Sequence, residues 1–173
     1  MAVVLETERL ILRRFTMADA PFIVELLNSP GWLQYIGDRD IKTVAQAQSY
    51  LLNGPLLSYA AHGYGLYMIE SKNGHQPMGM CGLLKREYLD HLDIGYALLP
   101  QYEGYGYAQE IVAATMQYAF TELKVEALAA ITMVENTKSI RLLCKLGFVQ
   151  NGTINAGGDK ELLLFIRSAQ TDK

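Results

Sequence analysis

Two closely spaced glycines, Gly104 and Gly106, follow an apolar segment and precede a stretch with helical spacing of apolar residues. With Gln101 they form the pattern Gln-x-x-Gly-x-Gly. Because glycine has no Cβ, such a loop can turn sharply and bring its backbone close to a ligand. A helix that begins directly after the loop presents unpaired N–H groups and the positive end of its dipole there. The segment therefore predicts a site for a phosphate or pyrophosphate group.

Two better-known phosphate-binding loops do not fit this segment. A dinucleotide-binding fingerprint requires Gly-x-Gly-x-x-Gly, and its last position is here Gln109. A P-loop requires Gly-Lys-Ser/Thr, and the chain contains no Gly-Lys pair. Judged by the loop alone, an ordinary glycine-containing turn between a strand and a helix stays open as an alternative.

Two further segments carry distinctive patterns. Asn136-x-x-Ser139 leads to Lys145-x-Gly-Phe, and residues 6–14 contain Thr-x-Arg-Leu-x-Leu-Arg. Together with the loop 101–106, these segments resemble the GNAT acetyltransferases in order and spacing. Residues 6–14 are similar to the opening of the Rim-type ribosomal-protein N-acetyltransferases. The resemblance spans nearly the whole chain and implies an enzyme that moves an acetyl group directly from acetyl-CoA to a primary amine.

The resemblance also implies how acetyl-CoA binds. Backbone N–H groups of the loop would hold the pyrophosphate, with Gln101 at the loop entrance. The preceding strand would part from its neighbour and offer its edge to the pantetheine arm, with one N–H polarising the thioester carbonyl. Asn136 would contact pantetheine, and it is also suited to be the N-cap of a helix. Lys145 would lie near the phosphates, with a solvated lysine at a helix end as the alternative. The residues so assigned to the cofactor are Ala97, Leu98, Leu99, Gln101, Glu103, Gly104, Tyr105, Gly106, Tyr107, Ala108, Asn136 and Lys145.

An amine acceptor must lose a proton before it attacks, because the pKa of a lysine amine is near 10.4 and that of an α-amine near 7.7–8.0. Asp93 is the candidate base, acting directly or through water, and a solvated or hairpin-paired aspartate is the alternative. Strand alternation places Asp93 on one face with Gly95 and Ala97. Many family members have a Tyr acid where this chain has Leu143. Ser139 is therefore the candidate partner of the leaving thiol, or else an ordinary residue of a first helical turn.

The identity of the acceptor is left open by the sequence. Trp32 and Tyr35 fall where related enzymes form the acceptor pocket, although an ordinary packing cluster is the alternative. The acceptor is either a protein N-terminal α-amine or a small amine. Because the Tyr acid is missing, a second hypothesis is a non-catalytic or weakly active acyl-CoA-binding sensor with the same fold.

Composition limits the other classes of function. The chain has 173 residues, which predicts a single domain over 1–173, and a formal net charge of −3, which argues against a nucleic-acid partner. Its two cysteines and three histidines show no metal-ligand spacing, so no metal is expected. The sequence shows neither a signal peptide nor an apolar run of the roughly 18 residues that a membrane span needs, so a cytoplasmic protein without a membrane partner is expected. A monomer and a homodimer both remain open.

The order of the expected elements predicts an α+β fold. Strands are expected over 8–14, 64–71, 78–86, 92–98, 127–133, 148–151 and 161–167, and helices from Asp19, over 43–53, 55–61, 106–123 and 137–146. Residues 28–31 are expected to end the first helix. This order suits a three-layer arrangement with a mixed sheet between helices. The resemblance adds that the sheet is mostly antiparallel and that two of its strands splay to form the acetyl-CoA cleft.

Overall fold

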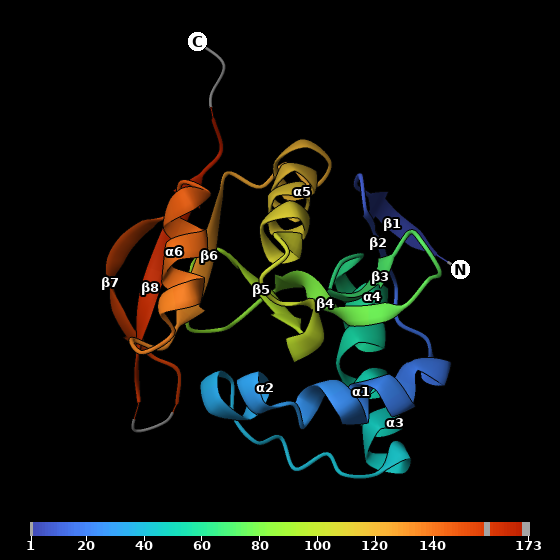
Figure 1. The fold of residues 1–173 in the computed structure, drawn as a ribbon. Coiled ribbons are helices and arrows are strands. Elements are labelled where there is room, and N and C mark those ends of the chain that lie inside the picture. Colours follow the sequence, from blue (N-terminus) through green and yellow to red (C-terminus); the bar gives the residue numbers. More distant parts are fainter. Residues whose placement is uncertain (1, 158–159, 171–173) are drawn as a thin grey trace.

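The computed structural model describes residues 2–157 and 160–170. Over these residues the chain forms an eight-stranded sheet in the order β1-β2-β3-β4-β5-β6-β8-β7, with helices packed against it (Figure 1). The strands are β1 (Val3–Glu6), β2 (Leu10–Arg13), β3 (Leu66–Ser71), β4 (Pro77–Leu84), β5 (Leu92–Leu98), β6 (Ala127–Thr132), β7 (Val149–Asn155) and β8 (Glu161–Ser168). The helices are α1 (Ala20–Leu27), α2 (Pro30–Tyr35), α3 (Val44–Asn53), α4 (Pro55–His62), α5 (Tyr107–Thr121) and α6 (Thr137–Lys145), with 3-10 turns η1 (Met17–Asp19) and η2 (Pro100–Tyr102).

The strands β5 and β6 form the one parallel pair of the described sheet, and this pair is short. Its register covers Leu92 with Leu128 and Asp93 with Ala129, and no further pair follows. By contrast, β4 and β5 stay in register from Leu84 and Asp93 to Gly79 and Leu98. Beyond Asp93, β5 therefore leaves β6, and Figure 1 shows the two ribbons diverging between α5 and α6. The sheet is therefore parted between β6 and residues 94–98 of β5, and we call this part of the sheet the opening.

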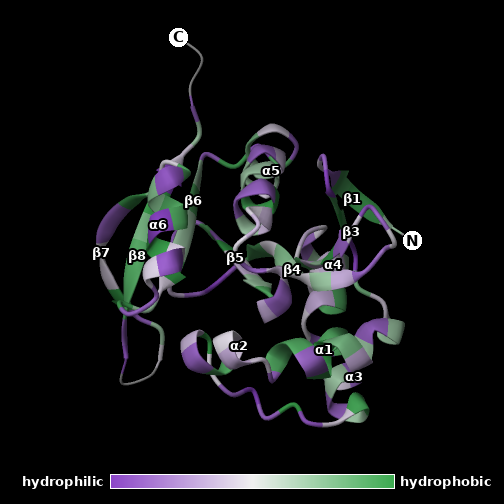
Figure 2. Ribbon diagram, viewed as in Figure 1, coloured by the Kyte–Doolittle hydropathy of each residue, from purple (hydrophilic) through white to green (hydrophobic). Residues whose placement is uncertain are grey.

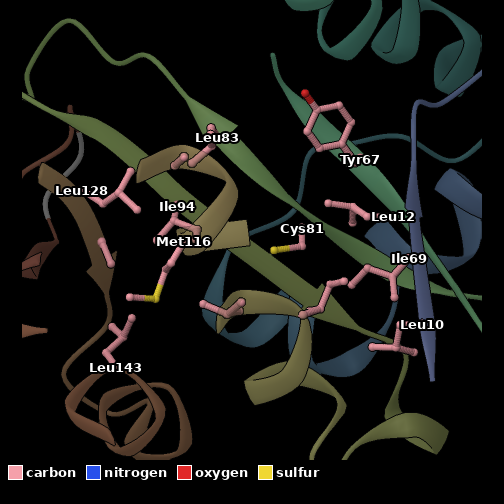
Figure 3. Packing of buried hydrophobic residues seen from close by; sticks show 14 of the residues in the cluster. Leu10, Leu12, Tyr67, Ile69, Cys81, Leu83, Ile94, Met116, Leu128 and Leu143 are labelled. Carbon is pink, nitrogen blue, oxygen red and sulfur yellow. The ribbon is translucent and has the colours of Figure 1, made fainter. Parts of the chain in front are cut away.

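Alternating side chains of the sheet pack into two hydrophobic cores. The first joins the sheet to α5 and α6, and Figure 3 shows Ile94, Met116 and Leu143 within it. The second joins the sheet to α1, α2 and α3 through residues such as Met80 and Leu99. Because neighbouring residues of a strand face opposite sides, β5 contributes to both cores. The expected α+β class, with a mixed and mostly antiparallel sheet between helices, is confirmed.

The helix α6 illustrates how the sequence sets a boundary. It begins after Asn136, whose side chain accepts a hydrogen bond from Ser139 N–H at 3.3 Å, as an N-cap does. It ends before Gly147, which has φ +87° in the left-handed region that glycine adopts without strain. Between these signals hydrophilic and hydrophobic residues alternate along the ribbon (Figure 2), and the apolar residues face the sheet.

The N-terminal region contains two elements that were not expected, although α1 ends at Leu27 as residues 28–31 indicated. The single strand expected over 8–14 begins at Leu10 instead, and a turn over residues 7–9 connects it to β1, which was not expected. Pro30 does more than end α1, because it is the first residue of the additional helix α2. Proline favours that position, since the N–H it lacks has no partner in a first turn. The expected helices over 43–53 and 55–61 are confirmed to within one residue.

Candidate active site

The loop after β5 ends in two glycines with left-handed backbone. Gly104 has φ +86° and Gly106 has φ +82°, and Gly106 is the N-cap of α5. No side chain caps this helix, so the first N–H groups of α5 have no capping partner from Gly106. A Cβ placed on Gly104 would meet nothing within 4 Å, which leaves open space against the backbone. The loop therefore fits an anionic group held by backbone N–H groups, as a CoA pyrophosphate requires.

The edge of β5 that faces the opening carries the backbone groups of alternate residues. Leu99 N–H donates to Met78 O at 2.8 Å, so its amide faces β4. Because backbone groups alternate along a strand, Ala97 also faces β4, while Tyr96 and Leu98 face β6. Past Asp93, β6 is no longer in register to pair with them. Of the three residues expected to supply backbone contacts, Leu98 is thus the one whose N–H points into the opening.

Asp93 lies where β5 and β6 part, and it is paired. Its side chain is 3 % exposed, and Arg86 donates Nε–H to its Oδ2 at 2.8 Å. Burial raises the pKa of Asp93 to about 6, although Arg86 opposes this shift by its hydrogen bond and charge. The surroundings of Asp93 are thus those of an aspartate paired within the β4–β5 hairpin, which was the alternative to a catalytic base. The raised pKa also suits a base that works near neutral pH, so pairing and catalysis are compatible. Arg86 was not expected as a functional residue.

A hydrogen bond across the opening joins β5 to α6. Tyr96 donates its hydroxyl to Ser139 Oγ at 2.9 Å, and both side chains are half-buried. Burial raises the pKa of Tyr96 to about 12, although the hydrogen bond with Ser139 opposes the shift, so this hydroxyl stays protonated at neutral pH. Tyr96 was missed because nothing in the sequence places it opposite Ser139. Strand alternation alone could have placed its side chain on the α5–α6 side.

The remaining residues expected on α6 differ in their surroundings. Asn136 is the N-cap, and Lys145 is exposed at the last residue of the helix. Leu143 is buried in the first core, 1 % exposed, so its position supplies packing and no acid. Lys138, also exposed, lies 3.6 Å from Glu103 of the glycine loop. This ion pair joins α6 to the loop, whereas the hydrogen bond of Ser139 joins α6 to β5.

The two residues expected at the acceptor pocket both lie on α2. Trp32 is 6 % exposed and packs in the second core, whereas Tyr35 is half-buried at the end of the helix. The indole N–H of Trp32 is buried and has no hydrogen-bond partner among the residues that the structure describes. The second core also contains Leu99 and Ala97 of the segment that leads into the loop. The helix α2 therefore belongs to the side of the sheet toward which Asp93 points by alternation.

Within residues 2–157 and 160–170, no group of three or more His, Cys, Asp or Glu residues could hold a metal ion. None of the helices described for these residues is long and apolar enough to cross a membrane.

Comparisons with known proteins agree with this geometry. The family described as acetyltransferase (GNAT) domain matches residues 9–149. The uncharacterized N-acetyltransferase p20 of Bacillus licheniformis is 30 % identical over 154 residues, which cover 87 % of this chain and 84 % of that protein. The uncharacterized N-acetyltransferase YoaA of Bacillus subtilis is 28 % identical over 153 residues, covering 87 % of this chain and 85 % of that protein.

A solved structure shares the fold. The acetyltransferase from Agrobacterium tumefaciens superimposes with a TM-score of 0.82 at 22 % identity, covering 98 % of this chain and 95 % of that one. The two chains therefore share one fold over nearly their whole lengths. The family match covers both the glycine loop and the opening beside β5. The chain belongs to the GNAT family of acetyltransferases.

Proposed function

We propose that the chain transfers an acetyl group from acetyl-CoA directly to a primary amine, and that this amine is a protein N-terminal α-amine. The observation that carries the proposal is the glycine loop. Gly104 and Gly106 lead with left-handed backbone into a helix N-terminus without a side-chain cap. They lie directly beyond a strand edge that, within residues 2–157 and 160–170, has no partner strand on one side. An anion with an extended, amide-containing arm fits both features at once.

The residues of the loop and of β5 would hold acetyl-CoA, which supplies the acetyl group as a thioester. The N–H groups from Gly104 to Ala108 would face the pyrophosphate, and Gln101 lies at the entrance. Glu103 N–H, which was also expected to face it, instead donates to Pro100 O at 3.2 Å. The open edge of β5 pairs with the pantetheine amides as a neighbouring strand would. Leu98 N–H is the donor that polarises the thioester carbonyl, because Leu99 N–H already donates to Met78. Asn136 and Lys145 contribute from α6.

Asp93 is the base in this proposal and works through water. Its carboxylate is too buried for direct contact with a bulky acceptor, but a raised pKa of about 6 leaves it largely ionised and basic at neutral pH. Arg86 keeps the carboxylate oriented through the 2.8 Å hydrogen bond. There is open space on the same face of β5 two residues on, because a Cβ on Gly95 would meet nothing within 4 Å.

Ser139 donates a hydrogen bond that stabilises the leaving thiolate. Its Oγ already accepts the hydroxyl hydrogen of Tyr96 at 2.9 Å, so its own hydrogen is free to turn toward another acceptor. Tyr96 therefore orients the Ser139 hydroxyl as a donor. A thiol pKa near 8.5 makes the thiolate a fair leaving group, so this assistance speeds the reaction without being indispensable.

Two considerations support an α-amine acceptor. An α-amine has a pKa near 7.7–8.0 and is partly neutral at physiological pH, so a base acting through water suffices. The chain also superimposes with a TM-score of 0.82, at 17 % identity and covering 96 % of this chain and 97 % of that one, on RimL, a ribosomal L7/L12 alpha-N-protein acetyltransferase in complex with coenzyme A. A lysine acceptor would need a stronger base than the one present, because its amine is almost wholly protonated.

The test combines binding with turnover. Calorimetric titration with acetyl-CoA, CoA, NAD and ATP is expected to show binding of the first two only. CoA release is then measured with peptides that carry a free α-amine, the same peptides with that amine blocked, and a panel of polyamines and aminoglycosides. Turnover that requires the free α-amine supports the proposal. Turnover with the small amines alone would overturn the choice of acceptor.

A sensor of acyl-CoA remains the second candidate function, for a specific reason. Leu143 is buried where relatives carry a Tyr, and Asp93 is engaged by Arg86. Tight binding of acetyl-CoA without CoA release across the whole amine panel would favour this function over catalysis.

A further inference from the structure

The turn between β1 and β2 reaches across to the start of α5. Arg9, in this turn, donates Nε–H to Glu110 Oε2 at 2.7 Å, and its Nη2 lies 2.7 Å from the same oxygen. The other carboxylate oxygen accepts hydrogen bonds from Arg9 N–H at 2.9 Å and from Thr7 Oγ1 at 2.6 Å. The guanidinium also lies over the ring of Tyr107, 4.3 Å from its centroid. A residue remote in sequence is thus fastened to the glycine loop.

Glu110 needs a counter-charge if an anion is to bind beside it. It is the acidic residue in the first turn of α5, at the same helix end that would receive a pyrophosphate. Partial burial raises its pKa, but the hydrogen bonds from Thr7 and Arg9 outweigh this and lower the pKa overall, so Glu110 is ionised. An ionised carboxylate at a helix N-terminus interacts favourably with the helix dipole, but it repels an anionic ligand at the same end. The fork of Arg9 covers the carboxylate and removes this repulsion.

Arg9 also fixes a peptide of the loop. Its Nη1 donates to Tyr105 O at 3.0 Å. In a trans peptide the carbonyl and the following N–H point in opposite directions. Gly106 N–H is therefore directed away from Arg9, which approaches from the β2 side of the sheet, whereas β6 and the opening lie on the other side of β5.

We propose that Arg9 is a positioning residue for the pyrophosphate site: it neutralises Glu110 and holds the Tyr105–Gly106 peptide with its N–H directed toward the ligand. The inference rests on the proposed binding of acetyl-CoA to the loop. It explains why a residue of the N-terminal motif and a residue just after the glycine loop, 101 positions apart, are joined by several hydrogen bonds.

The experiment is a charge cycle read by calorimetry with acetyl-CoA. Arg9→Ala is expected to raise Kd about tenfold, with kcat at saturating acetyl-CoA unchanged within about twofold. Glu110→Gln in the Arg9→Ala background is expected to recover about half of that loss, because the repelling charge is gone while the loop peptide stays unheld. Arg9→Lys is expected to fall between wild type and Arg9→Ala, since lysine keeps the charge but not the fork.

Two controls make the result decisive. Arg14→Ala removes the same charge from an exposed residue that lies over the ring of Tyr59, and it is expected to leave Kd unchanged. The loss caused by Arg9→Ala is expected to shrink as NaCl is raised, because salt screens repulsion, whereas general loosening of the loop would not respond in this way.

Unchanged Kd in folded Arg9→Ala, or no recovery by Glu110→Gln, would overturn the inference. Should Arg9→Ala fail to fold, the same comparison with Arg9→Lys decides, and a Kd equal to wild type then refutes it. Failure of wild-type protein to bind acetyl-CoA is a separate outcome that refutes the proposed function itself.

Discussion

Two helix N-termini, those of α5 and α6, flank the opening between β5 and β6, and they are built differently. The N-terminus of α6 is closed by Asn136, whose side chain accepts from Ser139 N–H at 3.3 Å. The N-terminus of α5 has Gly106 as its N-cap, without a side-chain cap. The stronger N-cap residue is thus on α6, although both helices need one equally.

The difference separates a structural helix end from a binding one. A side-chain cap satisfies N–H groups within the protein and stabilises the helix by about 1 kcal/mol. A glycine without a side chain leaves the same groups to an outside partner and gives that partner room to approach. We therefore expect changes at the N-cap of α5 to alter mainly ligand binding, and changes at the N-cap of α6 to alter mainly stability.

The largest effect is expected from filling the space beside the uncapped N-terminus of α5. Gly104→Val places a branched side chain in the space against the loop backbone and is expected to raise the Kd for acetyl-CoA at least about 100-fold in calorimetry. Gly152→Val is the matched control, because Gly152 also has positive φ, +78° against +86°, and nothing within 4 Å of its Cβ. Both variants should lose about 1–2 kcal/mol through left-handed backbone strain. Equal losses of acetyl-CoA affinity in the two would break the comparison.

The role of Asp93 as the base on β5 can be tested through the pH dependence of kcat. Because its pKa is raised to about 6, kcat is expected to fall as pH drops below 6, where the base becomes protonated. Asp93→Asn is expected to lower kcat about 100-fold at pH 7 and to remove this acidic limb from a pH–rate profile. Two acceptors whose amines differ in pKa provide the control, since a limb that belongs to the acceptor moves with it. A limb that persists in Asp93→Asn would exclude Asp93 as the base.

The stability effect of Asp93 has the opposite sign from its effect on catalysis. A carboxyl whose folded pKa exceeds its ordinary value of 3.8 contributes stability below that value, and the contribution is lost as pH rises through about 6. The same ionisation that activates the base thus makes the folded state less stable.

Removal of the hydrogen bond between Tyr96 of β5 and Ser139 of α6 should have an intermediate effect. Tyr96→Phe removes the hydroxyl that Ser139 accepts at 2.9 Å and is expected to lower kcat about tenfold with little change in KM for acetyl-CoA. Ser139→Ala should lower kcat at least as much, and the double variant no further, because the pair acts as a unit. Additive losses measured by steady-state kinetics would show that the two hydroxyls act independently.

The smallest functional effect is expected at the closed end. Asn136→Ala should lower the free energy of unfolding by about 1 kcal/mol in denaturant titration, through loss of the N-cap. Asn136→Ser keeps a capping oxygen and should recover most of that stability. A loss of acetyl-CoA affinity as large as that of Gly104→Val would remove the contrast between the two helix ends.

The parts of this site that sequence could predict are those with local causes. Glycine at positive φ and an N-cap at the start of a helix are set by neighbouring residues, so local pattern alone places Gly104, Gly106 and Asn136. The contact between Tyr96 and Ser139 depends on where α6 packs, 43 positions away, and no local pattern encodes it. The expected layer arrangement followed from the order of elements.

The N-terminal region was the hardest part to predict. The four residues of β1 are too few to show a clear alternation of polar and apolar residues. All four residues of β2 are buried, so β2 lacks the alternation of buried and exposed residues that is typical of a half-exposed strand. Pro30 follows Asn28 and Ser29 and resembles a terminator, yet it occupies the first position of α2. Arg86, too, becomes visible only once β4 and β5 are paired and bring it to Asp93.

The short pairing of β5 with β6 has a consequence for the lifetime of the protein in a cell. Two registered pairs join these strands, and beyond them the described part of the chain leaves one edge of β5 without a partner strand. If a pantetheine arm lies along that edge, the co-substrate completes the architecture as well as the reaction. At a concentration 100 times its Kd, a ligand that binds only the folded state adds about 2.7 kcal/mol to stability. Supply of acetyl-CoA would then set how much of this protein survives proteolysis, and abundance would follow the metabolic state.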